Sequence, residues 1–149
     1  MGISALQTLN GWLEGFRYDP DALDYDGIPF SAALPNIPHN STVFFGVPYA
    51  TPPVGDFRWR SPQPVSSWSG LRQAKRKTPS CAQACDELLG ECSEDCLYMN
   101  IFVPNRAIDE NDQVAVAIWF HGGAFRWGQG GTILYDARLI SGQDGSCKR

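Results

Sequence analysis

The stretch from Val114 to Phe125 decides the fold, and it reads Val-Ala-Val-Ala-Ile-Trp-Phe-His-Gly-Gly-Ala-Phe. Seven consecutive apolar residues, Val114 to Phe120, stop abruptly at His121. A run of this length, rich in β-branched and aromatic residues, is typical of a strand that is buried on both faces, as in parallel sheets. We therefore predict a central β-strand over Val114–Phe120.

Two adjacent glycines, Gly122 and Gly123, follow the predicted strand. Glycine readily adopts positive φ, which allows the backbone to turn its N–H groups outward. Ligands of open α/β sheets bind just beyond the carboxyl ends of the strands, and a pair of N–H groups held there suits the stabilisation of an oxyanion. The alternative, a strand followed by a glycine-rich turn that does no chemistry, stays open on these residues alone.

Length and composition describe an ordinary globular domain. The chain has 149 residues, of which 43% are hydrophobic and 19% charged, enough for one domain with a core. The net charge of −4 gives no indication of a nucleic-acid partner or an acidic membrane surface. We expect no membrane span, because no apolar run approaches the required length.

Local patterns predict several further elements. Asn10-Gly11 lies between apolar-rich flanks in residues 6–18 and predicts a β-hairpin with a type I′ turn. We expect a loop from Asp19 to Asn40, then strands over Thr42–Val47 and Leu97–Val103 and a short helix from about Ala137.

Four of the five cysteines are clustered, at Cys81, Cys85, Cys92 and Cys96. Four cysteines allow three disulfide pairings, and the sequence does not choose among them. Their spacing also admits a zinc site of four thiolates. Because no turn-forming pair lies between Cys85 and Cys92, we favour disulfides over zinc.

The compartment stays open. Clustered cysteines suit an oxidising environment, and Asn40-Ser41-Thr42 would be an N-glycosylation acceptor there, although such triplets commonly arise by chance. The N-terminus as written lacks the cationic and apolar regions of a signal peptide, which suits the cytoplasm.

Several motifs, taken in order, resemble the type-B carboxylesterase family, which includes cholinesterases and fungal lipases. The resemblance extends from about Leu9 to Ile140, and Ser-Glu-Asp-Cys-Leu is its most specific signature. The matching segments are Phe45–Ala50, Pro52–Gly55 with Arg58, Pro62–Pro64 with Trp68, Cys81-Ala82-Gln83, Ser93–Asn100 and Trp119–Phe125 with Gly128.

The resemblance implies an α/β class fold. We expect an incomplete α/β-hydrolase fold that contains an N-terminal β-hairpin and a mostly β portion of the central sheet. Residues 1–149 would form a single partial domain that stops before the nucleophile elbow. Secretion is also typical of the family.

The resemblance also implies roles for individual residues. Gly123 and Ala124 would supply oxyanion N–H groups, and Gly122 would shape the turn. Ala124 replaces a residue that is usually glycine, a change that keeps the N–H and is harmless if φ there is negative.

The signature residues carry implied roles as well. The family pairs the first cysteine with that of the signature, here Cys81 with Cys96, so that Cys85 and Cys92 would form a nested bridge or stay free. Glu94 would pair with an arginine that the sequence does not identify.

The residues of the family's catalytic triad are missing. The nucleophile is a serine in a G-x-S-x-G elbow, followed by an acid and a histidine. Gly11 and Gly15 are the only glycines of the sequence with this spacing, and Leu13 lies between them. The two histidines, His39 and His121, do not occupy the position of the family's base.

We therefore interpret the chain as the N-terminal piece of a carboxylic-ester hydrolase that uses no cofactor and no metal. A small-molecule ester would be its substrate only after completion by a C-terminal part. A choline ester is not expected, because no tryptophan lies between Cys81 and Cys96 to bind a quaternary ammonium group. Two alternatives are a non-catalytic partner-binding module and complementation by a separately encoded C-terminal piece.

The 149-residue chain is predicted to be catalytically silent, because without a nucleophile and a base only binding and oxyanion stabilisation remain. Release of p-nitrophenolate from a p-nitrophenyl ester should not exceed that of a Gly123→Pro variant. Turnover above this control would contradict the prediction.

Overall fold

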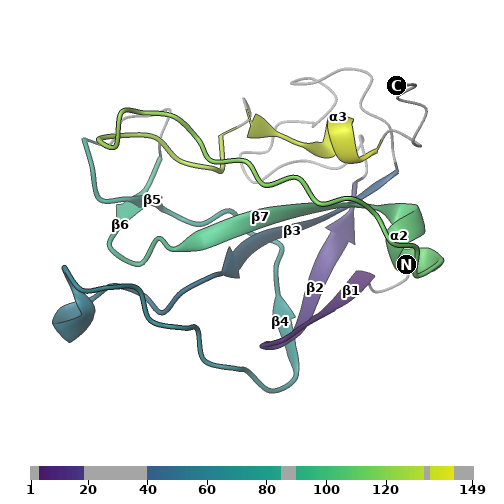
Figure 1. Cartoon of the computed structure of the whole chain (residues 1–149), viewed down its shortest axis with the longest axis horizontal. Coiled ribbons are helices and arrows are strands. Elements are labelled where there is room, and N and C mark those ends of the chain that lie inside the picture. Colours follow the sequence, from purple (N-terminus) through teal and green to yellow (C-terminus); the bar gives the residue numbers. More distant parts are fainter. Residues whose placement is uncertain (1–3, 19–39, 85–89, 133–134, 143–149) are drawn as a thin grey trace.

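The computed structural model describes residues 4–18, 40–84, 90–132 and 135–142, in which five strands form one sheet (Figure 1). Strand order is β1-β2-β3-β7, and β4 pairs with β2. The strands of this sheet are β1 (Ser4–Thr8), β2 (Gly11–Arg17), β3 (Ser41–Pro48), β4 (Leu71–Gln73) and β7 (Tyr98–Pro104).

Short elements surround this sheet. The strands β5 (Ser80–Cys81) and β6 (Cys92–Ser93) pair with each other in parallel. The described helices are η1 (Gly55–Phe57), α2 (Asn105–Asp109) and α3 (Arg138–Ser141), and none of them is long and apolar enough to cross a membrane. The predicted helix near Ala137 is thus confirmed, whereas residues 19–39 of the predicted loop lie outside the described residues.

The predicted hairpin is confirmed, but its turn is shifted by one residue. Thr8 pairs with Gly11, so that Leu9 and Asn10 form the turn rather than Asn10 and Gly11. Of these residues only Gly11 has positive φ, +146°, and the predicted type I′ turn is therefore wrong. A Cβ atom on Gly11 would lie 2.6 Å from Nε1 of Trp68, so this glycine is required by close packing.

The middle of the sheet is β3, in which every residue is buried. It pairs antiparallel with the end of β2 on one edge and with β7 on the other. Phe44 and Val47 of β3 pack with Leu13 of β2 and with Ala74, just after β4, to form the core. Both strands predicted here, Thr42–Val47 and Leu97–Val103, are confirmed to within one residue at each end.

An irregularity in β3 links it to β7. The register shifts between Phe44 and Val47, where Gly46 has φ +68°. The N–H of Gly46 donates to Oδ1 of Asn100 in β7 at 3.2 Å. A Cβ atom on Gly46 would lie 2.9 Å from the carbonyl oxygen of Arg76, which only glycine avoids.

A buried arginine fastens α3 to the sheet. Arg138 is 1% exposed, and its Nε donates to both carboxylate oxygens of Asp136 at 2.8 Å. Its guanidinium carbon lies 4.5 Å from the ring centroid of Tyr18. Ser41 at the start of β3 adds a hydroxyl contact of 2.8 Å to Ser141.

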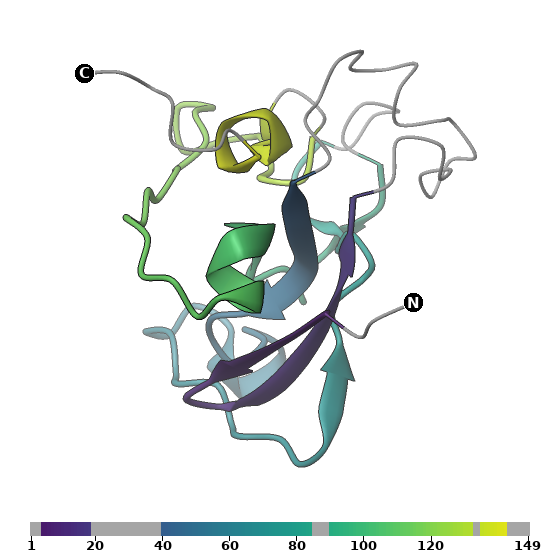
Figure 2. The ribbon, with the colours of Figure 1, turned by 90° about the vertical axis from the view of Figure 1, so that its right-hand side faces the viewer.

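The prediction of a central strand over Val114–Phe120 is wrong for the described structure. The segment follows α2 as a plain trace without strand pairing (Figures 1 and 2). Val116, Ile118 and Phe120 are 85%, 77% and 83% exposed, and Trp119, which points to the other side in extended chain, is 70% exposed. The apolar run indicates what the segment can bury, but a strand also needs a partner for its backbone groups.

Leu13 and Leu9 give a matched test of the core. Leu13→Ala should lower the free energy of unfolding by about 2–5 kcal/mol, because it leaves a cavity beside Phe44. Leu9→Ala, at a side chain that is fully exposed in the same hairpin, should change it by less than about 0.5 kcal/mol. Urea unfolding in dilute solution measures both, and equal effects would refute this assignment of the core.

The exposed apolar side chains of Val114–Phe120 should make the isolated chain self-associate, since a contiguous exposed apolar patch promotes aggregation. Ile118→Lys should raise the monomer fraction in size-exclusion chromatography. Leu9→Lys, at an exposed leucine outside the run, is the matched control. A cooperative melt of a monomeric unmodified chain would argue against this expectation.

Candidate oxyanion turn and its disulfide support

The residues after the apolar run form a tight turn. The carbonyl oxygen of Gly123 accepts hydrogen bonds from the N–H groups of Arg126 at 3.0 Å and Trp127 at 3.2 Å. Three successive residues have positive φ, with +128° at Gly123, +52° at Ala124 and +60° at Phe125. The chain therefore reverses over Gly123–Trp127, which we call the oxyanion turn after the role that we propose for it below.

The glycines of this motif have different structural roles. A Cβ atom on Gly123 would lie 1.7 Å from the carbonyl oxygen of Trp127, so no other residue fits there. A Cβ atom on Gly122 would meet nothing within 4 Å. Gly128, with φ +115°, closes the loop, because its Cβ position lies 2.8 Å from both the carbonyl oxygen of Gly122 and Nδ1 of His121.

The N–H groups of Gly123 and Ala124 are not used within the described part of the chain. Among the described residues, no hydrogen bond uses either group, and neither belongs to a strand ladder. Ala124 is exposed. Adjacent N–H groups at positive φ can together bind a negatively charged oxygen.

Ala124 differs from the sequence-based expectation. The substitution of the usual glycine was expected to be harmless at negative φ, but φ is +52°. This left-handed conformation costs a residue with a Cβ atom about 1 kcal/mol relative to its normal region. The turn thus carries local strain at one of the two proposed donors.

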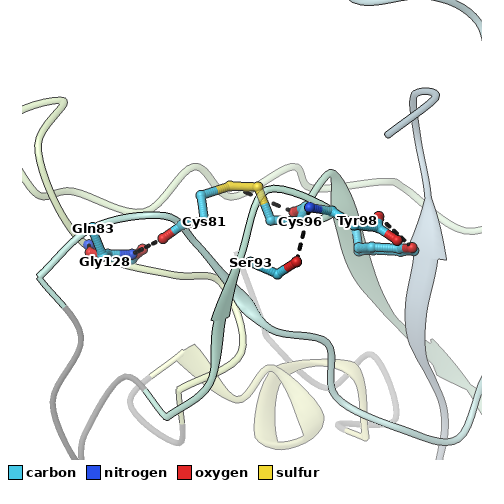
Figure 3. Close-up of a disulfide and its surroundings, with 7 residues drawn as sticks. Cys81, Gln83, Ser93, Cys96, Tyr98 and Gly128 are labelled. Atoms are coloured by element: carbon cyan, nitrogen blue, oxygen red, sulfur yellow. Dashed lines mark hydrogen bonds between the residues drawn. A yellow bond between two sulfur atoms is a disulfide. The ribbon is translucent and has the colours of Figure 1, made fainter. Parts of the chain in front are cut away.

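A disulfide between Cys81 and Cys96 supports the adjoining region (Figure 3). Their Cα atoms are 5.0 Å apart. Cys92 is also disulfide-bonded, and Cys85, its expected partner, lies outside the described residues. A zinc site of four thiolates is excluded because Cys81 and Cys96 are bonded to each other.

The acidic residues of the signature also have partners. Glu94 forms an ion pair with Arg58, the arginine that the sequence did not identify. The two residues come from segments far apart in the chain, and opposite charge alone does not select this pair from the other arginines. Asp95 accepts a hydrogen bond of 2.7 Å from the hydroxyl of Tyr98. The pKa of Tyr98 is raised, mainly by burial and to a smaller extent by this hydrogen bond.

Comparisons with known proteins agree with this architecture. A family described as the carboxylesterase family matches residues 32–144. The chain belongs to the carboxylesterase family. Fumonisin B1 esterase of Sphingopyxis macrogoltabida is 38% identical over 117 residues, which cover 74% of this chain and 21% of that protein. Human carboxylesterase 5A is 42% identical over 111 residues, which cover 66% of this chain and 19% of that protein.

Solved esterases share the fold. A PNB esterase superposes with a TM-score of 0.74 and 30% identity, covering 95% of this chain and 26% of the esterase. Carboxylesterase EST55 of Geobacillus stearothermophilus superposes with a TM-score of 0.67 and 32% identity, covering 90% of this chain and 22% of EST55. The predicted incomplete α/β-hydrolase fold is therefore confirmed, and this member of the carboxylesterase family spans about a fifth of the length of its curated relatives.

His121 takes no part in a triad among the described residues of this member of the carboxylesterase family. His121 donates from Nδ1 to the neighbouring carbonyl oxygen of Gly122 at 2.8 Å, and His39 lies outside the described residues. Within the described ranges, no group of three His, Cys, Asp or Glu side chains could hold a metal ion. The cavity lined by Asn100, Thr132 and Tyr135, of about 10 Å³, is roughly the size for one water and too small for an ester.

The glycosylation candidate is accessible. Asn40 is exposed, and its carbonyl oxygen accepts a hydrogen bond of 2.7 Å from the N–H of Asn105. Thr42 of the same triplet is buried in β3 and donates to Oδ1 of Asn105 at 2.7 Å. Glycan attachment at Asn40 stays a prediction.

Proposed function

We propose that the chain provides the oxyanion-binding part of a carboxylic-ester hydrolase and is inactive by itself. The observation that carries this proposal is the oxyanion turn, in which Gly123 and Ala124 present adjacent N–H groups that form no hydrogen bond with the described residues. Membership of the carboxylesterase family supports it.

The proposed chemistry assigns one task to this chain. A serine hydroxyl attacks the ester carbonyl carbon, its proton passes to a histidine, and the carbonyl electron pair moves onto oxygen. Two N–H dipoles fixed beside that oxygen lower the energy of the tetrahedral intermediate. Loss of one such donor typically lowers kcat by about 10²–10³-fold. The third N–H, the serine, the histidine and the acid would all come from a C-terminal part.

The substrate depends on that C-terminal part, because the pocket lined by Asn100, Thr132 and Tyr135 is too small to hold an ester. The relatives themselves are named for different activities, among them fumonisin B1 esterase and acetylcholinesterase 1 of Caenorhabditis briggsae. We propose a small-molecule carboxylic ester and do not expect a choline ester, because the first cysteine loop contains no tryptophan.

A non-catalytic partner-binding module is the second candidate. The exposed apolar side chains of Val116, Ile118, Trp119 and Phe120 favour it, because adjacent exposed apolar groups mark interaction sites. The same residues would also be covered by the C-terminal part of a hydrolase. Only the hydrolase proposal requires the N–H groups of the oxyanion turn to act on an ester.

A chimera tests the proposal. This chain replaces the matching part of the PNB esterase, which then supplies the nucleophile and the base. The chimera should hydrolyse p-nitrophenyl butyrate, and Gly123→Ala should lower kcat by about 10²-fold or more, because the new Cβ collides with Trp127 and reorients the donors.

Gly130→Ala is the matched control, since a Cβ atom there meets nothing within 4 Å and φ is not positive. It should leave kcat within about twofold. The proposal would be refuted by a folded chimera, verified by its thermal melt, in which Gly123→Ala is as active as Gly130→Ala.

A further inference from the structure

Gln83 makes a two-point contact with the backbone of Gly128 (Figure 3). Its Nε2 donates to the carbonyl oxygen of Gly128 at 2.9 Å, and its Oε1 accepts from the N–H of Gly128 at 2.7 Å. Nε2 also donates to the carbonyl oxygen of Cys81 at 3.0 Å. The side-chain amide therefore pairs with Gly128 as a neighbouring strand would.

Gly128 directly follows the oxyanion turn and contacts the two residues that precede that turn, His121 and Gly122. A Cβ atom on Gly128 would lie 2.8 Å from both the carbonyl oxygen of Gly122 and Nδ1 of His121, so the backbone of Gly128 packs closely against both residues. Between Gly122 and Gly128, the carbonyl oxygen of Gly123 accepts backbone hydrogen bonds from Arg126 and Trp127. A displacement of Gly128 would thus be transmitted to the residues that carry the proposed donors.

The backbone of Gln83 follows the paired strands β5 and β6 and the Cys81–Cys96 bond, which together we call the disulfide ribbon. It lies two residues after Cys81, which is bonded to Cys96, and Cys96 accepts a backbone hydrogen bond from Tyr98 at the start of β7. Ser80 and Cys81 in β5 also pair with Cys92 and Ser93 in β6. The position of Gln83 is therefore fixed relative to β7.

Asn100 provides a weaker second contact to the same loop. Its Nδ2 lies 3.4 Å from the carbonyl oxygen of Gly130, near the limit for a hydrogen bond. This single long contact does not restrain rotation of the loop, whereas the paired contacts of Gln83 do.

From these contacts we infer that Gln83 is a positioning residue for the oxyanion turn and that the Cys81–Cys96 disulfide holds it in place. The inference deepens the proposed function, on which its catalytic meaning rests. Gln83 forms no hydrogen bond with Gly123 or Ala124 among the described residues, and it acts through Gly128.

Hydrogen–deuterium exchange of the 149-residue chain, read residue by residue by mass spectrometry at micromolar concentration, tests this inference. Gln83→Met keeps the length of the side chain and removes both hydrogen bonds to Gly128. Exchange at Arg126 and Trp127, whose N–H groups are bonded to Gly123 and not to Gln83, should rise about tenfold. Exchange in β7 should stay unchanged.

Gln63→Met is the matched control, because the side-chain amide of Gln63 is exposed and donates to Ser61 in its own loop. It should leave the oxyanion turn unaffected. A change confined to Gly128 in Gln83→Met, or the same change in Gln63→Met, would overturn the inference.

The disulfide is tested by Cys81→Ser combined with Cys96→Ser. If the disulfide acts through Gln83, the exchange at Arg126 and Trp127 should rise as in Gln83→Met, and adding Gln83→Met should raise it little further. Independent, additive increases would overturn the role given to the disulfide.

The PNB esterase chimera separates positioning from folding. Gln83→Met should lower kcat about threefold to tenfold with little change in KM, because a misplaced donor acts mainly on the transition state. A rise in KM alone would contradict the positioning role. An inactive chimera would count against the proposed function, and the exchange result would still decide the role of Gln83.

Discussion

The enclosure of β3 is the constraint on which the rest of the structure depends. Paired on both edges and covered on both faces, it fixes where β7 lies and hence where the segment that contains Cys81 and Cys96, which precedes β7, joins the sheet. Close approach requires Gly15 in β2, because a Cβ atom there would lie 2.4 Å from the carbonyl oxygen of Val43. The oxyanion turn is positioned at the end of this series of contacts, through Cys96, Cys81, Gln83 and Gly128.

Elements whose signals are local could be predicted from the sequence. The strands around Val43 and Phe102 follow from short apolar runs bounded by turn residues and a proline. The hairpin turn lies one residue earlier than the Asn10-Gly11 pattern predicts, and Gly11 instead packs on Trp68, which is distant in sequence. The run of Val114–Phe120 was misassigned because an apolar pattern reports the capacity for burial, whereas pairing depends on strands that the described residues do not supply.

The candidate site, too, could be predicted from the sequence only where its signals are local. The adjacent glycines predicted a turn at Gly123, and its φ of +128° agrees with that reasoning. The positive φ of Ala124 could not be predicted, because alanine rarely adopts it and the turn imposes it. The contact between Gln83 and Gly128 joins residues 45 positions apart, and neither local propensity nor periodicity carries information over that distance. A motif can place a functional turn in the sequence without showing what holds it in position.

The central claim is that the N–H groups of Gly123 and Ala124 receive the negative oxygen of an ester intermediate. A crystal structure of the PNB esterase chimera, inhibited by an alkyl phosphonate that reproduces the tetrahedral intermediate, tests it most directly. We predict that the phosphonyl oxygen lies about 2.7–3.1 Å from the backbone nitrogens of both residues. A phosphonyl oxygen bound elsewhere, with these two N–H groups turned away from it, would contradict the account.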